Sequence, residues 1–455
     1  MEVVNDITKT GGIVTSTAQR VETEVLLPVT FNDSAQSSTC RFSLKNEGVL
    51  NHSSKLVIGL KDNAAVDRAF FAPHIGVDQV ISSCRLSIGG KTVCETQSWD
   101  KLQMLKSSFI SQTQNLEREQ YMSQKNMVNA FRYDRSHGTF ADNSVTDAEN
   151  YHVNPGTISN PSGGVHLQDY QLLKNTPTYS IDMRSLFPFF AAGHQLPLEL
   201  IDEEILVDIT FTPQTSRCFN ASGETKDQAF EIDRDELRIL QDIIHYPPEV
   251  MDSLRTRGKD GLVFTFQDFQ LTKQSLTSAQ ATNINRNLGG SGRMVDKVYW
   301  FVCDENASTN TLLGPLNAVS PAADGKLTAN LRINDKYVYP IDVDNPSRHF
   351  HNLTHAESGV PYLSMDEYCN FGLGAGGKGG LAGSLEGYEQ TEMAGKFFYH
   401  GIKNNMNERI NSQGVTLEAQ YNTLTDTGDV YTLFAWISVA KVVRIQDGKV
   451  NVLYL

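Results

Sequence analysis

Positive charge is scarce in this sequence. Its 39 Lys and Arg residues are outnumbered by 53 Asp and Glu residues, which leaves a formal net charge of −14 at pH 7. No segment gathers lysines or arginines into a basic arm or cluster. Proteins that hold nucleic acid by its phosphates, or that adhere to anionic lipid, depend on such a feature. The composition therefore argues against direct binding of nucleic acid and against adhesion to an anionic membrane.

Long apolar runs and closely spaced cysteines are also missing. No stretch approaches the ~20 apolar residues that cross a bilayer as a helix, and the first residues lack the basic segment and apolar core of a signal peptide. The six cysteines are widely separated, without metal-ligand spacing: Cys40, Cys84, Cys94, Cys218, Cys303 and Cys369. We expect these thiols to be reduced and buried, in a protein that is made inside the cell and not secreted through a signal peptide.

Long helical patterns are the third absence. Most periodic segments are short, and glycine, proline and polar turn formers are spread along all 455 residues. The share of hydrophobic residues (40%) and of charged residues (20%) is that of an ordinary globular protein. These features predict many strands joined by loops. The lack of regularly spaced helices argues against a parallel α/β sheet.

Residues 80–109 contain the clearest local pattern. An alternating apolar segment runs up to Gly89-Gly90, and a second segment leads away from this pair. Alternation predicts a half-buried strand, and the glycine pair supplies the positive φ of a tight turn, so we predict a hairpin. Apolar residues then recur every three or four positions from Trp99 onward. This spacing predicts a short amphipathic helix, with Ser98 as its cap.

The hairpin pattern recurs in the second half of the chain. Residues 331–338 repeat the Leu, Ile, Lys and Val of residues 86–93 in register, with Asn334-Asp335 in place of the glycine pair. Two more strand patterns recur in the same order: residues 55–60 as 297–302, and residues 205–211 as 415–419. We therefore interpret the chain as one antiparallel sandwich written twice.

This repeat predicts the domain organisation. We expect an arm, a first sandwich with a long polar insertion, a linker helix and a second sandwich, at residues 1–20, 21–246 (insertion 110–175), 247–260 and 261–455. Pro248 in the first turn and Gly258 past the end define the linker helix. Residues 196–200 are predicted as a strand. Residues 237–246 fit a buried strand, although their apolar spacing also fits a helix.

Three segments carry a resemblance to a known family. They are residues 85–100, the aromatic segment 187–190 that leads to residues 196–198, and residues 407–417. In these segments the chain resembles the double jelly-roll major capsid proteins of tailless icosahedral DNA viruses. Polinton-like viruses, virophages and nucleocytoplasmic large DNA viruses belong to this lineage. Residues 412–414 read Ser-Gln-Gly, a departure from the proline-Ser-Gly form that the family shows at this place.

The resemblance implies an all-β fold of two tandem eight-stranded antiparallel jelly rolls, a double jelly roll with short helices in the loops. It implies a homotrimer whose six rolls form a pseudo-hexagonal capsomer. Neighbouring capsomers, with penton and minor capsid proteins, would tile an icosahedral shell. The expected localisation is the virion capsid, and the expected role is that of a structural molecule and not of an enzyme. An acidic surface suits this role, because like charge keeps unassembled trimers apart.

Metal and nucleotide chemistry have only isolated candidates in the sequence. His349 and His351 would share one face of a strand, with His355 near them, but the glutamate pattern of a cupin-type metal site is missing. Residues 372–378 resemble the start of a P-loop, yet Gly379 stands where a Ser or Thr must hold Mg²⁺. We therefore assign no metal, no cofactor and no cofactor-binding residue.

Catalysis also has only isolated candidates in the sequence. The acidic run at residues 202–204 is interpreted as solvated charge at a strand end, and no Ser or Cys lies in a nucleophile motif. No catalytic residue is therefore assigned. Two alternatives to the capsid role stay open. One is a glycan- or receptor-binding viral jelly roll, in which Tyr151, Tyr170 and Tyr388 would stack on sugars, and the other is a cupin-like metalloenzyme built on the histidines.

Overall fold

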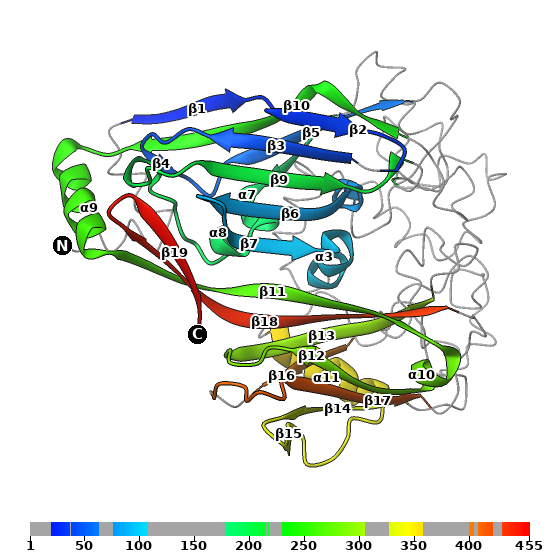
Figure 1. Cartoon of the computed structure of the whole chain (residues 1–455). Coiled ribbons are helices and arrows are strands. Elements are labelled where there is room, and N and C mark those ends of the chain that lie inside the picture. The colour runs from blue at the N-terminus through cyan, green and yellow to red at the C-terminus, as the bar shows by residue number, and fades with distance from the viewer. Residues whose placement is uncertain are drawn as a thin grey trace, which may run out of the picture.

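The computed structural model describes most of both predicted sandwiches (Figure 1). The described residues are 20–36, 38–62, 76–107, 178–214, 217, 230–304, 327–357, 400–404, 408–421 and 430–455. The predicted arm up to residue 19, the insertion at 110–175, the glycine-rich segment 372–379 and the three candidate tyrosines lie outside them. Within the described ranges, none of the helices combines the length and the apolar character of a membrane-spanning segment.

The first half of the chain forms two five-stranded antiparallel sheets that pack face to face. The first sheet has the order β1–β10–β5–β8, with β4 beside β10: Arg20–Leu26, Phe230–His245, Lys55–Asp62, Thr178–Asp182 and Val49–Leu50. The second has the order β2–β3–β9–β6–β7: Thr30–Asp33, Ser38–Leu44, Ile205–Phe211, Ile81–Ile88 and Lys91–Gln97. Alternate residues of β9, from Ile205 to Phe211, are buried between the sheets, as their period of two predicts.

The second half repeats this arrangement. Its first sheet has the order β11–β18–β13–β16: Leu262–Leu276, Tyr431–Gln446, Val295–Asp304 and His400–Lys403. Its second sheet has the order β12–β17–β14–β15: Asn283–Gly289, Val415–Tyr421, Leu327–Ile333 and Lys336–Tyr337. A last strand, β19 (Lys449–Tyr454), pairs with the end of β18.

Both halves follow the same path through their sheets. If β2, β4 and β19 are set aside, each half has eight strands in chain order, and β1, β3 and β5 to β10 correspond to β11 to β18. In each half the first, eighth, third and sixth strands form one sheet, and the second, seventh, fourth and fifth form the other. This is the jelly-roll path, and it confirms the predicted all-β double jelly roll.

The two predicted hairpin turns are equivalent in the fold. Gly89 and Gly90 have φ of 56° and 75°, and Asn334 and Asp335 have φ of 50° and 62°. All four residues lie in the left-handed region that a two-residue hairpin turn requires. Asparagine and aspartate tolerate this region better than most other residues, which explains why they can replace the glycine pair.

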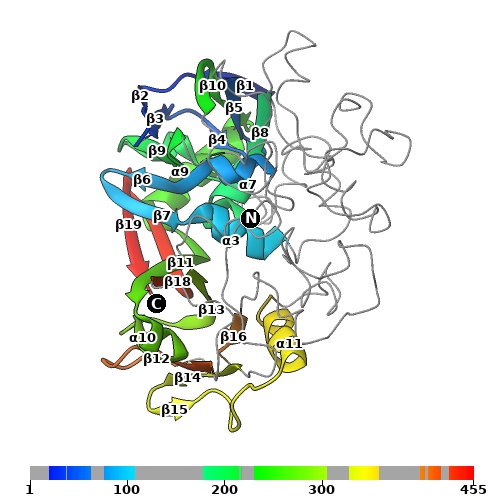
Figure 2. The ribbon, with the colours of Figure 1, turned by 90° about the vertical axis from the view of Figure 1, so that its right-hand side faces the viewer.

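Helices are short and occupy the connections. They are α3 (Trp99–Ser107), α7 (Met183–Leu186), α8 (Pro188–Ala191), α9 (Pro248–Asp260), α10 (Ser278–Thr282) and α11 (Pro346–Glu357), with the 3₁₀ turns η2 (Gly76–Val80) and η6 (Leu198–Leu200). The helix expected after the first hairpin is α3. Figure 2 shows α3 and α11 on the same side of the molecule, each beside its own roll.

Some local predictions need correction. Residues 196–200 are not a strand: Leu196 forms an isolated bridge to Leu50, and the turn η6 follows, because Pro197 has no N–H for a ladder. The linker helix runs through Gly258 and ends at Asp260, where Gly261 with its φ of 101° stops it. Residues 237–245 belong to the strand β10, which decides between the two readings of that segment.

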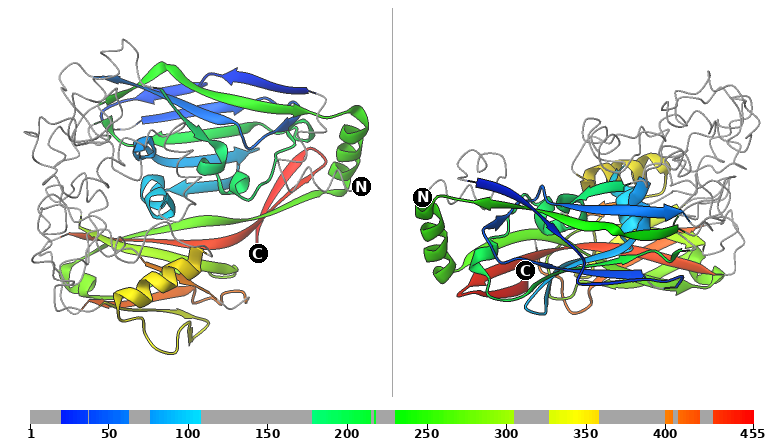
Figure 3. Two further views of the ribbon diagram at one scale, coloured as in Figure 1. Left: turned by 180° about the vertical axis from the view of Figure 1, so that it is seen from behind. Right: turned by 90° about the horizontal axis from the view of Figure 1, so that it is seen from above.

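The two rolls share apolar packing. Helix α9 joins β10 to β11 at one end of the molecule (Figure 3). The ribbon of β11, β18 and β19 then extends beyond the second roll and inserts side chains into the core of the first: Leu262, Phe264, Phe266, Val443, Ile445 and Val450. The Phe264 ring lies 5.5 Å from that of Phe189 on α8. The first roll therefore depends on residues from the C-terminal part of the chain for part of its core.

Candidate functional site

The candidate histidines do not form a metal site. His349, His351 and His355 lie on the helix α11 and not on a strand, so the expectation of a shared strand face was wrong. His349 is buried, and its ring lies 4.6 Å from that of His400 on β16, whereas His351 and His355 are exposed. Burial lowers the pKa of His349 to about 4 and that of His400 well below its ordinary value. Among the residues that the structure describes, no three His, Cys, Asp or Glu side chains are placed to hold a metal.

The acidic run at residues 202–204 connects the two halves of the chain. The Glu203 carboxylate accepts a hydrogen bond of 2.9 Å from the N–H of Val450 on β19, and it lies 3.9 Å from the Lys91 ammonium. The N–H of Asp202 donates to the carbonyl of Gly448, at 2.9 Å. These contacts attach the β18–β19 hairpin to the first roll, which is a structural role.

A charged triad crosses the outer face of the first roll. Asp208 on β9 lies between Arg41 on β3 and Arg85 on β6, at 2.6 Å from a guanidinium nitrogen of each. These residues are also register partners across the three strands. Burial alone would raise the pKa of Asp208, but the two guanidinium groups outweigh it and hold the pKa below its usual range.

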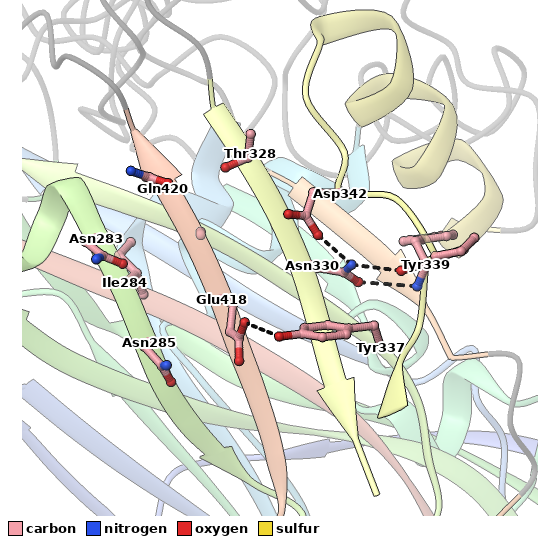
Figure 4. Close-up of a pocket in the computed structure, with 12 residues that line it drawn as sticks. Asn283, Ile284, Asn285, Thr328, Asn330, Tyr337, Tyr339, Asp342, Glu418 and Gln420 are labelled. Atoms are coloured by element: carbon pink, nitrogen blue, oxygen red, sulfur yellow. Dashed lines mark hydrogen bonds between the residues drawn. The ribbon is translucent and has the colours of Figure 1, made fainter. Parts of the chain in front are cut away.

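The equivalent place in the second roll is different. Glu418 on β17 corresponds to Asp208, and its register partners are Asn285 on β12 and Asn330 on β14. Both arginines of the first roll are thus replaced by shorter amides. Because the amides cannot cover the sheet as arginines do, a groove of about 380 Å³ lies here. We call it the polar groove (Figure 4).

Hydrogen bonds build one wall of the polar groove. The Asn330 amide nitrogen donates to the carbonyl of Tyr339 at 2.9 Å and to the Asp342 carboxylate at 2.8 Å, which holds that segment against the sheet. The Tyr337 hydroxyl donates to the Glu418 carboxylate at 3.0 Å. The remaining polar lining comes from neighbouring strands: Asn283, Asn285, Thr328 and Gln420. None of the described lining residues is basic.

Sequence reasoning missed the polar groove and the charged triad. The signal was present, because residues 205–211 and 415–419 were already recognised as the same strand. That alignment places Asp208 and Glu418 at one position, but their cross-strand partners are known only from the register.

A second surface lies on the outer side of β1. Val21 and Val25 are 51% and 56% exposed; their register partners on β10 are Ile244, which is buried, and Leu240, which is half-buried. Strand β1 is the edge of its sheet, since it pairs only with β10 among the described strands. We call Val21, Val25 and the outward side of β10 the β1 face. The free edge of a sheet offers unpaired backbone groups to which another chain can pair.

Comparison with solved structures identifies the fold. The chain superposes on PBCV-1 VP54, as fitted into a reconstruction of the virophage Sputnik, with a TM-score of 0.55 and 11% identity over 96% of this chain and 97% of that one. A chain of the PBCV-1 virus capsid matches equally well. The mavirus major capsid protein matches with a TM-score of 0.50 and 9% identity over 95% of this chain and 90% of that one. No family model and no curated protein matches the sequence.

Proposed function

We propose that this chain is a major capsid protein whose homotrimers form the capsomers of an icosahedral virus shell. The support is the double jelly roll, which covers nearly the full length of both this chain and the viral proteins with which it superposes. Neighbouring capsomers, penton and minor capsid proteins are then its partners, and the virion is its place. The observation that carries the proposal is the way in which the two rolls contact each other.

Inside the chain, one side of the first roll covers the outer face of a sheet of the second. The Trp436 indole N–H on β18 donates to the carbonyl of Gln97, at the end of β7, at 3.2 Å. The Lys101 ammonium on α3 lies 5.3 Å from the centre of the Phe434 ring. Leu102, also on α3, is part of the second roll's core cluster. The side that carries β7 and α3 thus contacts the β18 sheet.

Each roll also has a counterpart of the surface that the other roll uses in this contact. Neither of these two counterparts makes a contact of this kind with the other roll among the described residues. In the first roll, the β1 face is the counterpart of the covered β18 face. In the second roll, α11 follows β15 as α3 follows β7, so α11 is the counterpart of α3. We propose that α11 of one copy lies against the β1 face of the next.

A contact of this head-to-tail kind leads to a closed ring when the rotation per copy allows it. In a ring of three copies, six rolls follow one another with the same type of contact. This contact would also cover the exposed edge strand and its valines. Permanent interfaces of this kind bury on the order of 2,000–5,000 Å².

The proposal is tested by the mass of the purified protein. We expect a trimer of 50.5 kDa chains in mass photometry, and hexagonal capsomers in electron micrographs. Val25→Glu should weaken trimers at least tenfold, because it places a charge on the β1 face. Val263→Glu is the matched control, since Val263 is 58% exposed on another strand. A wild-type protein that stays monomeric at micromolar concentration contradicts the proposal.

A further inference from the structure

The polar groove is lined by groups that can bind a cation, and the second roll supplies fewer cations here than the first roll supplies at the equivalent place. In the first roll the corresponding carboxylate, that of Asp208, is contacted by two guanidinium groups from the flanking strands. In the second roll the flanking residues are Asn285 and Asn330, and Asn330 is turned toward the groove wall. The position of the carboxylate persists in both rolls, but two guanidinium groups contact it in the first roll and one, that of Arg332, in the second.

Arg332 supplies one cation from β14, but on the side of β12 Asn285 stands where the first roll has Arg41. The Arg332 Nε lies 3.4 Å from the Glu418 carboxylate, a longer distance than either contact in the first roll, and Arg332 is not among the lining residues. Glu418 and Asp342 therefore supply two carboxylates to a groove without a basic residue among its described lining. The groove attracts positive charge.

The other lining groups select a planar cation. Side-chain oxygens of Asn283, Asn285 and Gln420 can accept hydrogen bonds, and these amides have no hydrogen-bond partner among the described residues. The Tyr337 ring, 52% exposed, lies next to Glu418. A guanidinium group donates from five N–H groups in one plane and stacks on tyrosine rings, while an ammonium is a compact and strongly hydrated charge.

We propose that the polar groove binds a guanidinium group, namely an arginine side chain presented by a second copy of this chain. The identity of the partner rests on the proposed capsid function, which brings many copies into contact. The groove lies on the outer side of its sheet, so a neighbour can reach it (Figure 4). The arginine would take the position that Arg41 and Arg85 occupy on the first roll.

Binding can be measured with a small probe. We expect N-acetylarginine methylamide to give a saturable signal in saturation-transfer difference NMR with the full chain, and the lysine analogue to bind at least fivefold more weakly. Glu418→Gln should weaken the arginine probe about tenfold. The matched control is Asp208→Asn, which should leave probe binding unchanged because that carboxylate already has its cations.

A second variant tests the groove without changing Glu418. Asn285→Arg rebuilds the arrangement of the first roll, so its own guanidinium should fill the groove and abolish probe binding while the melting temperature is kept. Failure of the arginine probe to bind, equal loss in Asp208→Asn, or preference for N-acetylglucosamine over the arginine probe would overturn the guanidinium site.

The partner is tested separately from the site. Asn285→Arg and Glu418→Gln should lower the yield of assembled shells or of capsomer contacts severalfold in electron micrographs. Normal assembly of both variants would overturn the second copy as the partner. If the wild-type protein is monomeric, the proposed capsid function fails, yet probe binding still reports on the groove.

Discussion

Lys441 on β18 and Asp268 on β11 form an ion pair of 2.9 Å whose side chains are only 2% and 5% exposed. The pair lies where the ribbon of β11 and β18 passes from the second roll to the first. Burial raises the pKa of Asp268, and the Lys441 ammonium opposes this shift. The junction of the rolls therefore contains two charges that depend on each other.

Removal of one partner of this pair should be costly. We expect Asp268→Ala to lower the free energy of unfolding by about 3–5 kcal/mol, because it leaves a buried ammonium without its counter-charge. The double variant Asp268→Leu with Lys441→Met should cost much less, since no charge is then buried. Urea unfolding measures both. A single variant that costs less than the double variant would show that the pair does not act as a unit.

Two glycines with the same backbone conformation should respond differently to alanine. Gly414 and Gly292 have φ of 75° and 73°. A Cβ on Gly414 would lie 2.7 Å from the carbonyl oxygen of Gly289, whereas a Cβ on Gly292 would meet no atom within 4 Å. We expect Gly292→Ala to cost about 1–2 kcal/mol for its left-handed backbone alone. Gly414→Ala should cost clearly more in thermal or urea unfolding, and equal costs would contradict the steric argument.

The buried histidine makes stability depend on pH. His349 has a pKa of about 4, against an ordinary value of 6.5. Between these values the unfolded chain binds more protons than the folded chain, so stability falls as the pH falls from 6.5 to 4, by on the order of 3 kcal/mol. His349→Gln keeps a donor near the Leu327 carbonyl but cannot titrate, so it should reduce the slope, while the buried His400 with its lowered pKa retains the rest. The exposed His351 offers the control, since His351→Gln should retain the slope in urea unfolding at several pH values.

The first roll should be sensitive to a residue of the second half of the chain. Phe264 is buried among first-roll side chains, so Phe264→Ala should cost about 3–5 kcal/mol. Hydrogen exchange should speed up in β6 and β7 of the first roll, because the lost ring belongs to their core. Val263→Ala, beside it but exposed, should change stability by less than about 0.5 kcal/mol. Unchanged protection in β6 and β7 would mean that the shared core is not cooperative.

Local patterns predicted much of the fold. The hairpin at Gly89-Gly90 and its copy at Asn334-Asp335 were recognisable because a tight turn restricts the residues that can form it. The error at α11 also has a local cause. The prediction followed the alternate spacing of His349 and His351, although apolar residues three apart in this segment fit the helix that forms there.

The polar groove lay beyond such local patterns. Its lining residues come from β12, from β14, β15 and the segment after β15, and from β17, three parts that are distant from one another in the chain. Only the register across these strands shows that Glu418 lacks the arginines that flank Asp208. A sequence repeat shows that two residues occupy equivalent positions in the two rolls, but it does not show which side chains lie next to each of them on the neighbouring strands.

The sequence by itself determined the all-β architecture and its duplication, because alternation and turn residues act over a few positions and recur in both halves. The tertiary structure alone decided where the rolls meet, which outer faces stay open and which carboxylate has its cations. Those features depend on strand register and on packing between residues that are far apart in the chain, and each such contact involves a side chain whose partner the local sequence does not specify.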